Sequence, residues 1–464
     1  MSSEASFLSE RVAPPMIRYS NMTPLSFQGN QQLKHFFPSN QSTYSQSNNI
    51  IRIAISSSSA FLDGGNSYLK LDFQNNNATA NTTYTFSNSY HSLIERVRIV
   101  ASSGAQIEDI MYYNQLHAYL SDVLLSSEKR QTRLQEGYSQ AIVGNAVVAS
   151  TPFVSGDNII ANITAGITAS LNSLTSTITY DPTSVGCSEM SVAQTTSTTV
   201  YIPLELSQLV GSNKKLLPLF LTGELQLEIT LAARPCMVSS ITSPLTFEVS
   251  NVSYCSSMVE FSGGVNQALT AMVQQGGLHL HSTCWSNQKV TLTANQRSFV
   301  NSERLKSVKS ILIGFTDDNL VQVNKRVTNR QTNEVTSLQI KIGSDYYPPQ
   351  PIKATSTNPK SCGFYLNEVY KALGVYNDSN HSSMVNIYNF SDSTQALRKV
   401  GRAVYGFDLD SFGKSDVESG ISTIISNPIT VEMEGSAGNL AALTYLLYDC
   451  IFSITPDGQF ICSK

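Results

Sequence analysis

The same order of local sequence signals occurs twice along this chain of 464 residues. In each half, an alternating strand pattern leads to an amphipathic helix, a stretch rich in Ser, Thr and Asn, and three further strand patterns. The first series consists of Ser92–Val100, Ile107–Leu125, Tyr201–Leu206, Glu224–Leu231 and Thr246–Phe261. The second consists of Ser307–Phe315, Phe364–Leu373, Val404–Leu409, Pro428–Glu434 and Ala441–Phe460. This repetition predicts two similar β-rich domains, because single all-β domains often run to roughly 200 residues.

The strand signals rest on a period of two residues. Apolar residues alternate with polar or small ones at Ile51–Ile55, Leu69–Phe73, Leu225–Leu231, Leu338–Ile342 and Ile429–Met433. Such alternation predicts strands with one buried face. The nearly continuous apolar run Ala441–Ile454 instead predicts a central strand buried on both faces. A helix over Ala441–Tyr448 is the competing interpretation.

Glycines divide the chain into elements. Asp63-Gly64-Gly65 and Ser102-Ser103-Gly104 are turn signals, and the second leads into the helical spacing of Ile107–Leu125. A short helix over Val265–Met272 lies between two Gly-Gly pairs, and we place the domain boundary there. Another helix is predicted over Phe364–Leu373, with Gly374 as its C-terminal cap.

Many short strands and few helices favour β-sandwiches over parallel α/β units. Jelly rolls are the sandwiches that most often carry long loops at one end. We predict an extended, proline-containing arm at residues 1–26, a first domain at 27–262 and a second at 263–464. The low-charge stretch 146–199 is too long for an ordinary connection. It is interpreted as an ordered excursion with its own short strands, or as a contact to a partner.

Composition excludes several functional classes. Charged residues make up 14% of the chain, below the usual ~25%. The net charge of −4 provides no basic field for sequence-specific nucleic-acid binding. The seven cysteines include no C-x-x-C pair and are expected to be reduced, mostly buried thiols of a protein folded in cytosol or nucleus. The N-terminus lacks the apolar core of a signal peptide, and no run reaches the ~18 apolar residues of a membrane span.

No catalytic motif stands in a suitable context, so we expect no enzyme, cofactor or metal site. His279 and His281 share a strand face as in cupin-type metalloenzymes, but no carboxylate follows them closely. They are interpreted as an edge-strand pair, and a jelly-roll metalloenzyme stays as an unfavoured alternative. Asp408 and Asp410 are expected to cap a turn. His117 is interpreted as a packed histidine without a partner four residues on.

Two adjacent tyrosine pairs could form sugar-stacking platforms. Core or subunit contact is the favoured interpretation for both of them. The pairs are Tyr112-Tyr113 and Tyr346-Tyr347.

Several segments together resemble the double-jelly-roll major capsid proteins of virophages, polinton-like viruses and related eukaryotic DNA viruses. In the first half they are the strand Ile94–Val100, the turn from Gly104 to Ile107, the helix Tyr112–Leu125, and the Pro-Leu strands Tyr201–Leu206 and Leu216–Leu219. The connector is Val265–Val273, and the second half adds Tyr405–Asp410 and Ser419–Thr423. The similarity runs from about Phe27 to the C-terminus. The stretch 146–199 departs from it.

This resemblance implies an all-β fold of two consecutive eight-stranded antiparallel jelly rolls, with short helices in the loops. It implies a homotrimer of pseudo-hexagonal outline that tiles an icosahedral capsid, made in the host cytoplasm or nucleus and located in the virion. The implied partners are neighbouring capsomers, penton and minor capsid or cement proteins, with an internal membrane left open. A trimeric receptor-binding β-protein of a virus or cell surface is the alternative.

Overall fold

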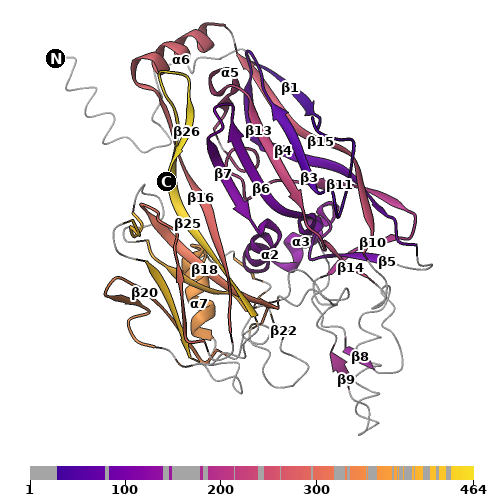
Figure 1. Ribbon diagram of the computed structural model, residues 1–464, viewed down its shortest axis with the longest axis vertical. Coiled ribbons are helices and arrows are strands. Elements are labelled where there is room, and N and C mark those ends of the chain that lie inside the picture. The colour runs from indigo at the N-terminus through magenta and orange to yellow at the C-terminus, as the bar shows by residue number, and fades with distance from the viewer. Residues whose placement is uncertain are drawn as a thin grey trace, which may run out of the picture.

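The computed structural model describes residues 29–78, 83–138, 146–148, 178–180, 187–213, 215–238, 245–261, 263–293, 296–317, 330–331, 335–351, 353, 363–378, 381–383, 385, 390, 400–401, 403–410, 419–424, 428–434 and 440–464. The arm predicted at residues 1–26 lies outside these residues. Figure 1 shows two sets of sheets side by side, the first in indigo and magenta and the second in orange and yellow.

Two antiparallel sheets, one of six strands and one of four, form most of the first set. One has the order β1 (Gly29–Phe36), β15 (Phe247–Phe261), β4 (Phe61–Asn75), β11 (Ser197–Ile202), extended by β2 (Thr43–Ser45) and β12 (Leu217–Pro218). The other has the order β3 (Ile50–Ile55), β13 (Leu225–Leu231), β6 (Ile94–Ala101), β7 (Gln106–Met111). A smaller sheet joins β10 (Cys187–Ala193), β5 (Thr83–Ser87) and β14 (Cys236–Val238).

The second set repeats this plan. One sheet has the order β16 (Leu278–Thr291), β25 (Leu440–Ile454), β18 (Val308–Asp317), with β23 (Tyr405–Asp408), β19 (Arg330–Gln331) and β22 (Val400–Gly401) beyond β18 and β26 (Phe460–Ser463) on β25. The other has the order β17 (Ser298–Asn301), β24 (Ile429–Glu434), β20 (Ser337–Ile342), β21 (Asp345–Tyr347).

Both sets have the strand order of a jelly roll. If the eight principal strands are numbered along the chain, the first sheet of each set reads 1-8-3-6 and the second reads 2-7-4-5. This order places the first and last strands together, as two Greek keys folded into one sandwich require. The predicted duplication and the all-β fold class are therefore confirmed. We call the two sets roll one and roll two.

Burial explains why these segments form strands. Ile51, Ile53 and Ile55 are fully buried while their neighbours are not, as the period-two pattern predicts. The run Ala441–Ile454 lies in β25 between β16 and β18, so the central-strand interpretation is confirmed. The buried apolar residues of both rolls form one contiguous cluster, so the rolls share a packed boundary.

The helices are short and lie at the ends of the rolls. They are α2 (Tyr113–Leu124), α3 (Ser127–Thr132), α5 (Leu219–Thr222), α6 (Gly263–Gly276) and α7 (Gly363–Ala372), with 3₁₀ turns at Tyr90–Leu93 and Leu134–Glu136. The predicted connector and Phe364–Leu373 helices are confirmed, and Gly374 follows α7 at φ +74°. None of the helices in the described parts is long and apolar enough to cross a membrane.

Three sequence predictions were wrong in detail. Residues Gln106–Met111 form the edge strand β7 rather than the start of a helix, because they pair with β6. Arg96 and Asp109 of these paired strands form a 2.6 Å ion pair. The predicted turn at Asp63-Gly64-Gly65 lies inside β4 as an irregularity, where Ser256 pairs with Ser67 and Ser257 with Asp63. The strand predicted to reach Leu206 ends at Ile202.

The stretch 146–199 is partly described. Two short strands, β8 (Ala146–Val148) and β9 (Ile178–Tyr180), pair with each other, in agreement with an excursion that has its own strands. Its last residues do not belong to the excursion, because β11 begins at Ser197 and pairs with β4 in the main sheet. The strand β10 within this stretch pairs with β5 of roll one, while residues 149–177 and 181–186 lie outside those described.

Candidate functional site: the joint between the two rolls

Helix α2 of roll one lies against the first sheet of roll two. The ring of Tyr119 meets the ring of Tyr445 on β25 edge to face, with centroids 5.7 Å apart. Tyr119 also covers Gly314 of β18, where an added Cβ would come within 2.5 Å of the ring carbon Cζ. The hydroxyl of Tyr445 donates to the backbone carbonyl of Tyr112 at 3.0 Å. Almost all of α2 is buried, because roll one covers one side and roll two the other.

A buried carboxylate ties the two rolls together through ion pairs. Asp122 of α2 accepts from Arg130 at 2.6 Å and from Arg330 of β19 in roll two. The guanidinium of Arg330 also stacks over the ring of Tyr119 at 5.0 Å. Ser383 donates to the backbone carbonyl of Asp122 at 3.2 Å. Removing one partner of such buried ions leaves uncompensated charge, so the cluster fixes how the rolls sit.

A second buried polar contact is made by Glu108 of β7. Glu108 is fully buried and accepts from the Ser207 hydroxyl at 2.6 Å and the Gln208 backbone N–H at 2.9 Å. Its burial raises the pKa of the carboxyl, and these two hydrogen bonds oppose that shift. The Cys284 thiol of β16 approaches the same carboxylate at 4.0 Å. Gln208 accepts from Ser282 of roll two at 2.9 Å, so this loop also spans the joint.

The sequence-predicted residues are not brought together. His279 and His281 lie on the edge strand β16, and His279 contacts the Ser453 hydroxyl at 2.8 Å. The Asp408 carboxylate accepts from the backbone N–H of Asp410 at 3.2 Å where β23 ends, as a turn cap does. Tyr113 is fully buried, in agreement with a core role for that tyrosine.

The fold assembles one ionisable cluster that sequence reasoning missed. His91 and His117 stack face to face, with ring centroids 3.6 Å apart and planes 10° apart. Glu205 lies 3.6 Å from Nε2 of His117 and pairs with Arg133. The Tyr138 hydroxyl lies 3.1 Å from the same Nε2. His117 was correctly interpreted as packed, but its partners are distant in sequence and no spacing rule could find them.

This cluster is the one group of three potential metal ligands in the described residues, namely His91, His117 and Glu205. An imidazole binds a metal along its nitrogen lone pair, in the plane of the ring, at about 2.0–2.1 Å. Two rings stacked 3.6 Å apart share no such point. His91 Nε2 also donates to the Pro203 carbonyl at 3.0 Å, so that nitrogen is already used. The arrangement does not fit a metal ion.

Burial sets the charge of this cluster. Desolvation lowers the pKa of His91 well below 6.5, and the neighbouring His117 lowers it further. Desolvation also lowers the pKa of His117, although Glu205 opposes the shift. For Glu205, burial alone would raise the pKa, but His117, His91 and Arg133 together bring it below its ordinary value. At neutral pH the stack is therefore two neutral rings beside a carboxylate and a guanidinium.

Comparison with known proteins was made on sequence and on structure. No family model matches the chain, and no curated protein sequence matches it. Solved structures do match. VP54 of PBCV-1, as fitted into a cryo-EM reconstruction of the virophage Sputnik, aligns with a TM-score of 0.56 and 11% identity over 96% of this chain and 99% of that chain.

Two virophage structures agree with this match. The Sputnik virophage structure aligns with a TM-score of 0.53 and 15% identity, covering 97% of this chain and 92% of that chain. The mavirus major capsid protein aligns with a TM-score of 0.50 and 10% identity, covering 97% and 94%. The likeness spans both rolls and the connection between them.

The fold is a double jelly roll. Within the double jelly roll, α2 and β7 of the first roll form the joint with β16, β18 and β25 of the second. The joint contains hydrophobic, aromatic and ionic contacts, and a pocket of about 250 Å³ opens beside it between α2, Gln208 and Trp285 of β16.

Proposed function

We propose that this chain is a major capsid protein, located in the virion, whose copies build an icosahedral virus shell. The observation that carries the proposal is the pair of rolls with the same strand order, held in a buried joint. The near full-length fold match to capsid proteins supports it. Its role is structural rather than catalytic.

The joint also supports a specific assembly. It brings β7, an edge strand of roll one, beside β16, an edge strand of roll two. The counterparts of these strands are β21 in roll two and β1 in roll one, which also end their sheets. A second copy could therefore repeat the joint, with its β21 placed near β1 of the first. A ring of three chains and six rolls uses every such edge.

This homotrimer has heterologous interfaces, because roll two of one copy meets roll one of the next. Obligate interfaces of this kind bury on the order of 2,000 Å² or more. We further propose that α6 marks the boundary between roll one, at 27–262, and roll two, at 263–464. Residues 1–26 then form the arm beneath the shell, and neighbouring capsomers, penton and cement proteins are the remaining partners.

Light scattering tests the assembly directly. The purified chain is expected to run as a stable trimer at micromolar concentration, and a stable monomer would reject the proposal. Electron microscopy of concentrated trimers is expected to show shells or hexagonal sheets. Deleting residues 1–26 should leave the trimer intact and impair shell formation. Loss of folding on that deletion would contradict the arm assignment.

A further inference from the structure

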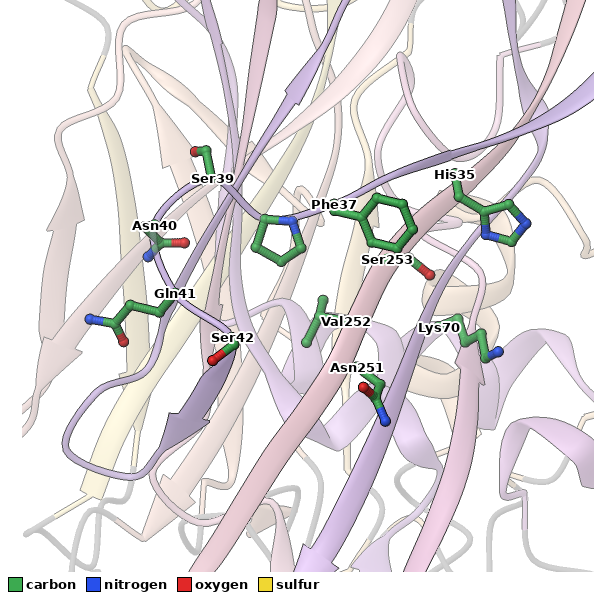
Figure 2. A pocket seen from close by; sticks show the side chains of 11 residues that line it. His35, Phe37, Ser39, Asn40, Gln41, Ser42, Lys70, Asn251, Val252 and Ser253 are labelled. Carbon is green, nitrogen blue, oxygen red and sulfur yellow. The ribbon is translucent and has the colours of Figure 1, made fainter.

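Roll one has a notch in the edge of its first sheet. Strand β1 pairs with β15 as far as Phe36 opposite Tyr254, and β2 resumes with Thr43 opposite Ser250. Residues 251–253 of β15 are thus left without a neighbouring strand on this edge. The chain between β1 and β2 loops around the gap and leaves a groove of about 800 Å³. Figure 2 shows the side chains of this loop and of β15 around the groove.

The loop that frames the notch is firmly held. The Asn40 side chain donates to the Ile50 carbonyl at 2.7 Å and accepts from the Arg52 backbone N–H at 3.2 Å and the Tyr44 hydroxyl at 2.8 Å. The Ser39 backbone N–H donates to the Arg52 carbonyl at 2.8 Å. These bonds anchor the loop to β3, so the groove is a built feature of the roll.

The lining of the notch is mostly uncharged and polar, with one lysine, Lys70, and one phenylalanine, Phe37. Lys70 and His35 line it, and no acidic residue does. Among the described residues, no carboxylate forms an ion pair with Lys70, while the nearby Asp72 accepts from Thr199 and Asn251 at 2.7 Å each. The side chain of Phe37 is 68% exposed at the rim. An occupant with a carboxylate and apolar or aromatic groups would suit this surface.

Roll two has no notch at the corresponding place. Strand β16 pairs with β25 without interruption, from Leu278 opposite Ile454 to Thr291 opposite Ala441. The gap in roll one lies where β15 itself has a register shift against β4, between Ser250 and Ser253.

The position of Tyr445 is where the other roll docks within the chain. Its hydroxyl donates to the carbonyl of Tyr112, the residue that follows β7. The ammonium of Lys289, on the neighbouring β16, lies 5.5 Å from the centroid of the Tyr112 ring. In the internal joint, the corner at Tyr112, which follows β7, the fifth strand of roll one, thus packs on the first sheet of roll two.

We propose that the notch receives the corresponding corner of a second copy, Asp345–Pro351, which begins with β21, the fifth strand of roll two. The inference rests on the proposed trimer and names the contact that closes it. Asp345 is exposed and reaches Lys70 as its counter-ion. Tyr346 and Tyr347 are half-buried on this corner, and they are the aromatic groups that it brings to the notch.

Crosslinking tests the contact at the level of residues. The double variant Ser39→Cys with Asp345→Cys, treated with a short bismaleimide, is expected to give covalent trimers on a denaturing gel. The matched control keeps Ser39→Cys and places the second thiol at Asp457→Cys, on the exposed turn after β25, and should stay uncrosslinked. If the wild type forms a trimer but the variant with Ser39→Cys and Asp345→Cys does not crosslink, the notch contact is overturned and the capsid proposal stands. A wild type that scatters as a monomer overturns both.

Reversing the charge of Lys70 and filling the notch with a large side chain test the same contact independently, through their effect on trimer formation. Lys70→Glu should weaken trimer formation on the order of tenfold by placing like charges together, and adding Asp345→Lys should restore it. Ser39→Trp fills the notch and should block the trimer while the monomer keeps its melting temperature. Ser47→Trp, on the exposed loop after β2, is the control and should assemble normally. Normal assembly of both Ser39→Trp and Lys70→Glu overturns the proposal.

Discussion

The carboxylate of Asp122 accepts a hydrogen bond from the guanidinium of Arg330, 208 positions further along the chain. The same carboxylate accepts from Arg130, so one side chain joins a helix of roll one to a strand of roll two. Both arginines are 2% exposed or less. The two rolls are therefore held by groups that water does not reach.

Asp122→Ala should destabilise the chain strongly, by about 3–5 kcal/mol in the free energy of unfolding, because it leaves two buried guanidinium groups without their shared carboxylate. Urea unfolding measures the change. Glu228→Ala is the matched control, since it removes the carboxylate shared by the partly exposed Arg52 and Arg98 and should cost less than about 1 kcal/mol for each pair. Equal costs for the two variants would show that Asp122 does not clamp the joint.

The histidine stack makes stability depend on pH. The pKa values of His91 and His117 in the folded chain lie below 6.5, the ordinary value. At a pH between the pKa of a histidine in the folded chain and its pKa in the unfolded chain, the unfolded chain binds more protons. Acid therefore favours unfolding. Stability should be constant above about pH 6.5 and fall below it, by up to about 1.4 kcal/mol per pH unit for each histidine.

Melting curves between pH 7.5 and 5 check this slope. His117→Gln should flatten it, whatever its effect on the melting temperature at pH 7.5. His281→Asn, an exposed histidine on β16, should keep the wild-type slope. A slope unchanged by His117→Gln would exclude the stack as its source.

Gly314 is required by the ring of Tyr119. A Cβ at this position would overlap the hydroxyl and ring carbons of Tyr119, so Gly314→Ala should cost about 1–3 kcal/mol. Gly263→Ala, at the start of α6, meets open space and should change stability by less than about 0.5 kcal/mol. The double variant Gly314→Ala with Tyr119→Leu should cost less than the sum of the two single changes, as measured by urea unfolding. Strict additivity would contradict the contact.

Local sequence patterns predicted most strands but not every boundary. The alternation at Ile51–Ile55 and the run Ala441–Ile454 required buried faces, and the fold supplies them. The spacing of Ile107 and Ile110 fitted a helix equally well, and only pairing with β6 decided for a strand. A bulge such as that at Gly64 depends on the register of β15, which no local signal encodes.

The candidate sites were harder to predict, because they depend on distant pairs. His91, His117 and Glu205 come from a 3₁₀ turn, a helix and a loop, and only the closed sandwich places them together. Arg330 meets Asp122 only after two rolls have folded and docked. The sequence shows which ionisable residues the chain contains, but which of them meet is decided by how the strands and the two rolls are arranged.

The covalent link through α6 has a consequence for the kinetics of assembly. Within one chain, the contact between rolls forms at a rate that does not depend on protein concentration, because the tether sets a high effective concentration. A ring of six rolls built from this chain needs three bodies to meet instead of six. Six separate rolls would need about five association steps and three chains need about two, so the peptide links replace the other three, and rings with an odd number of rolls cannot form.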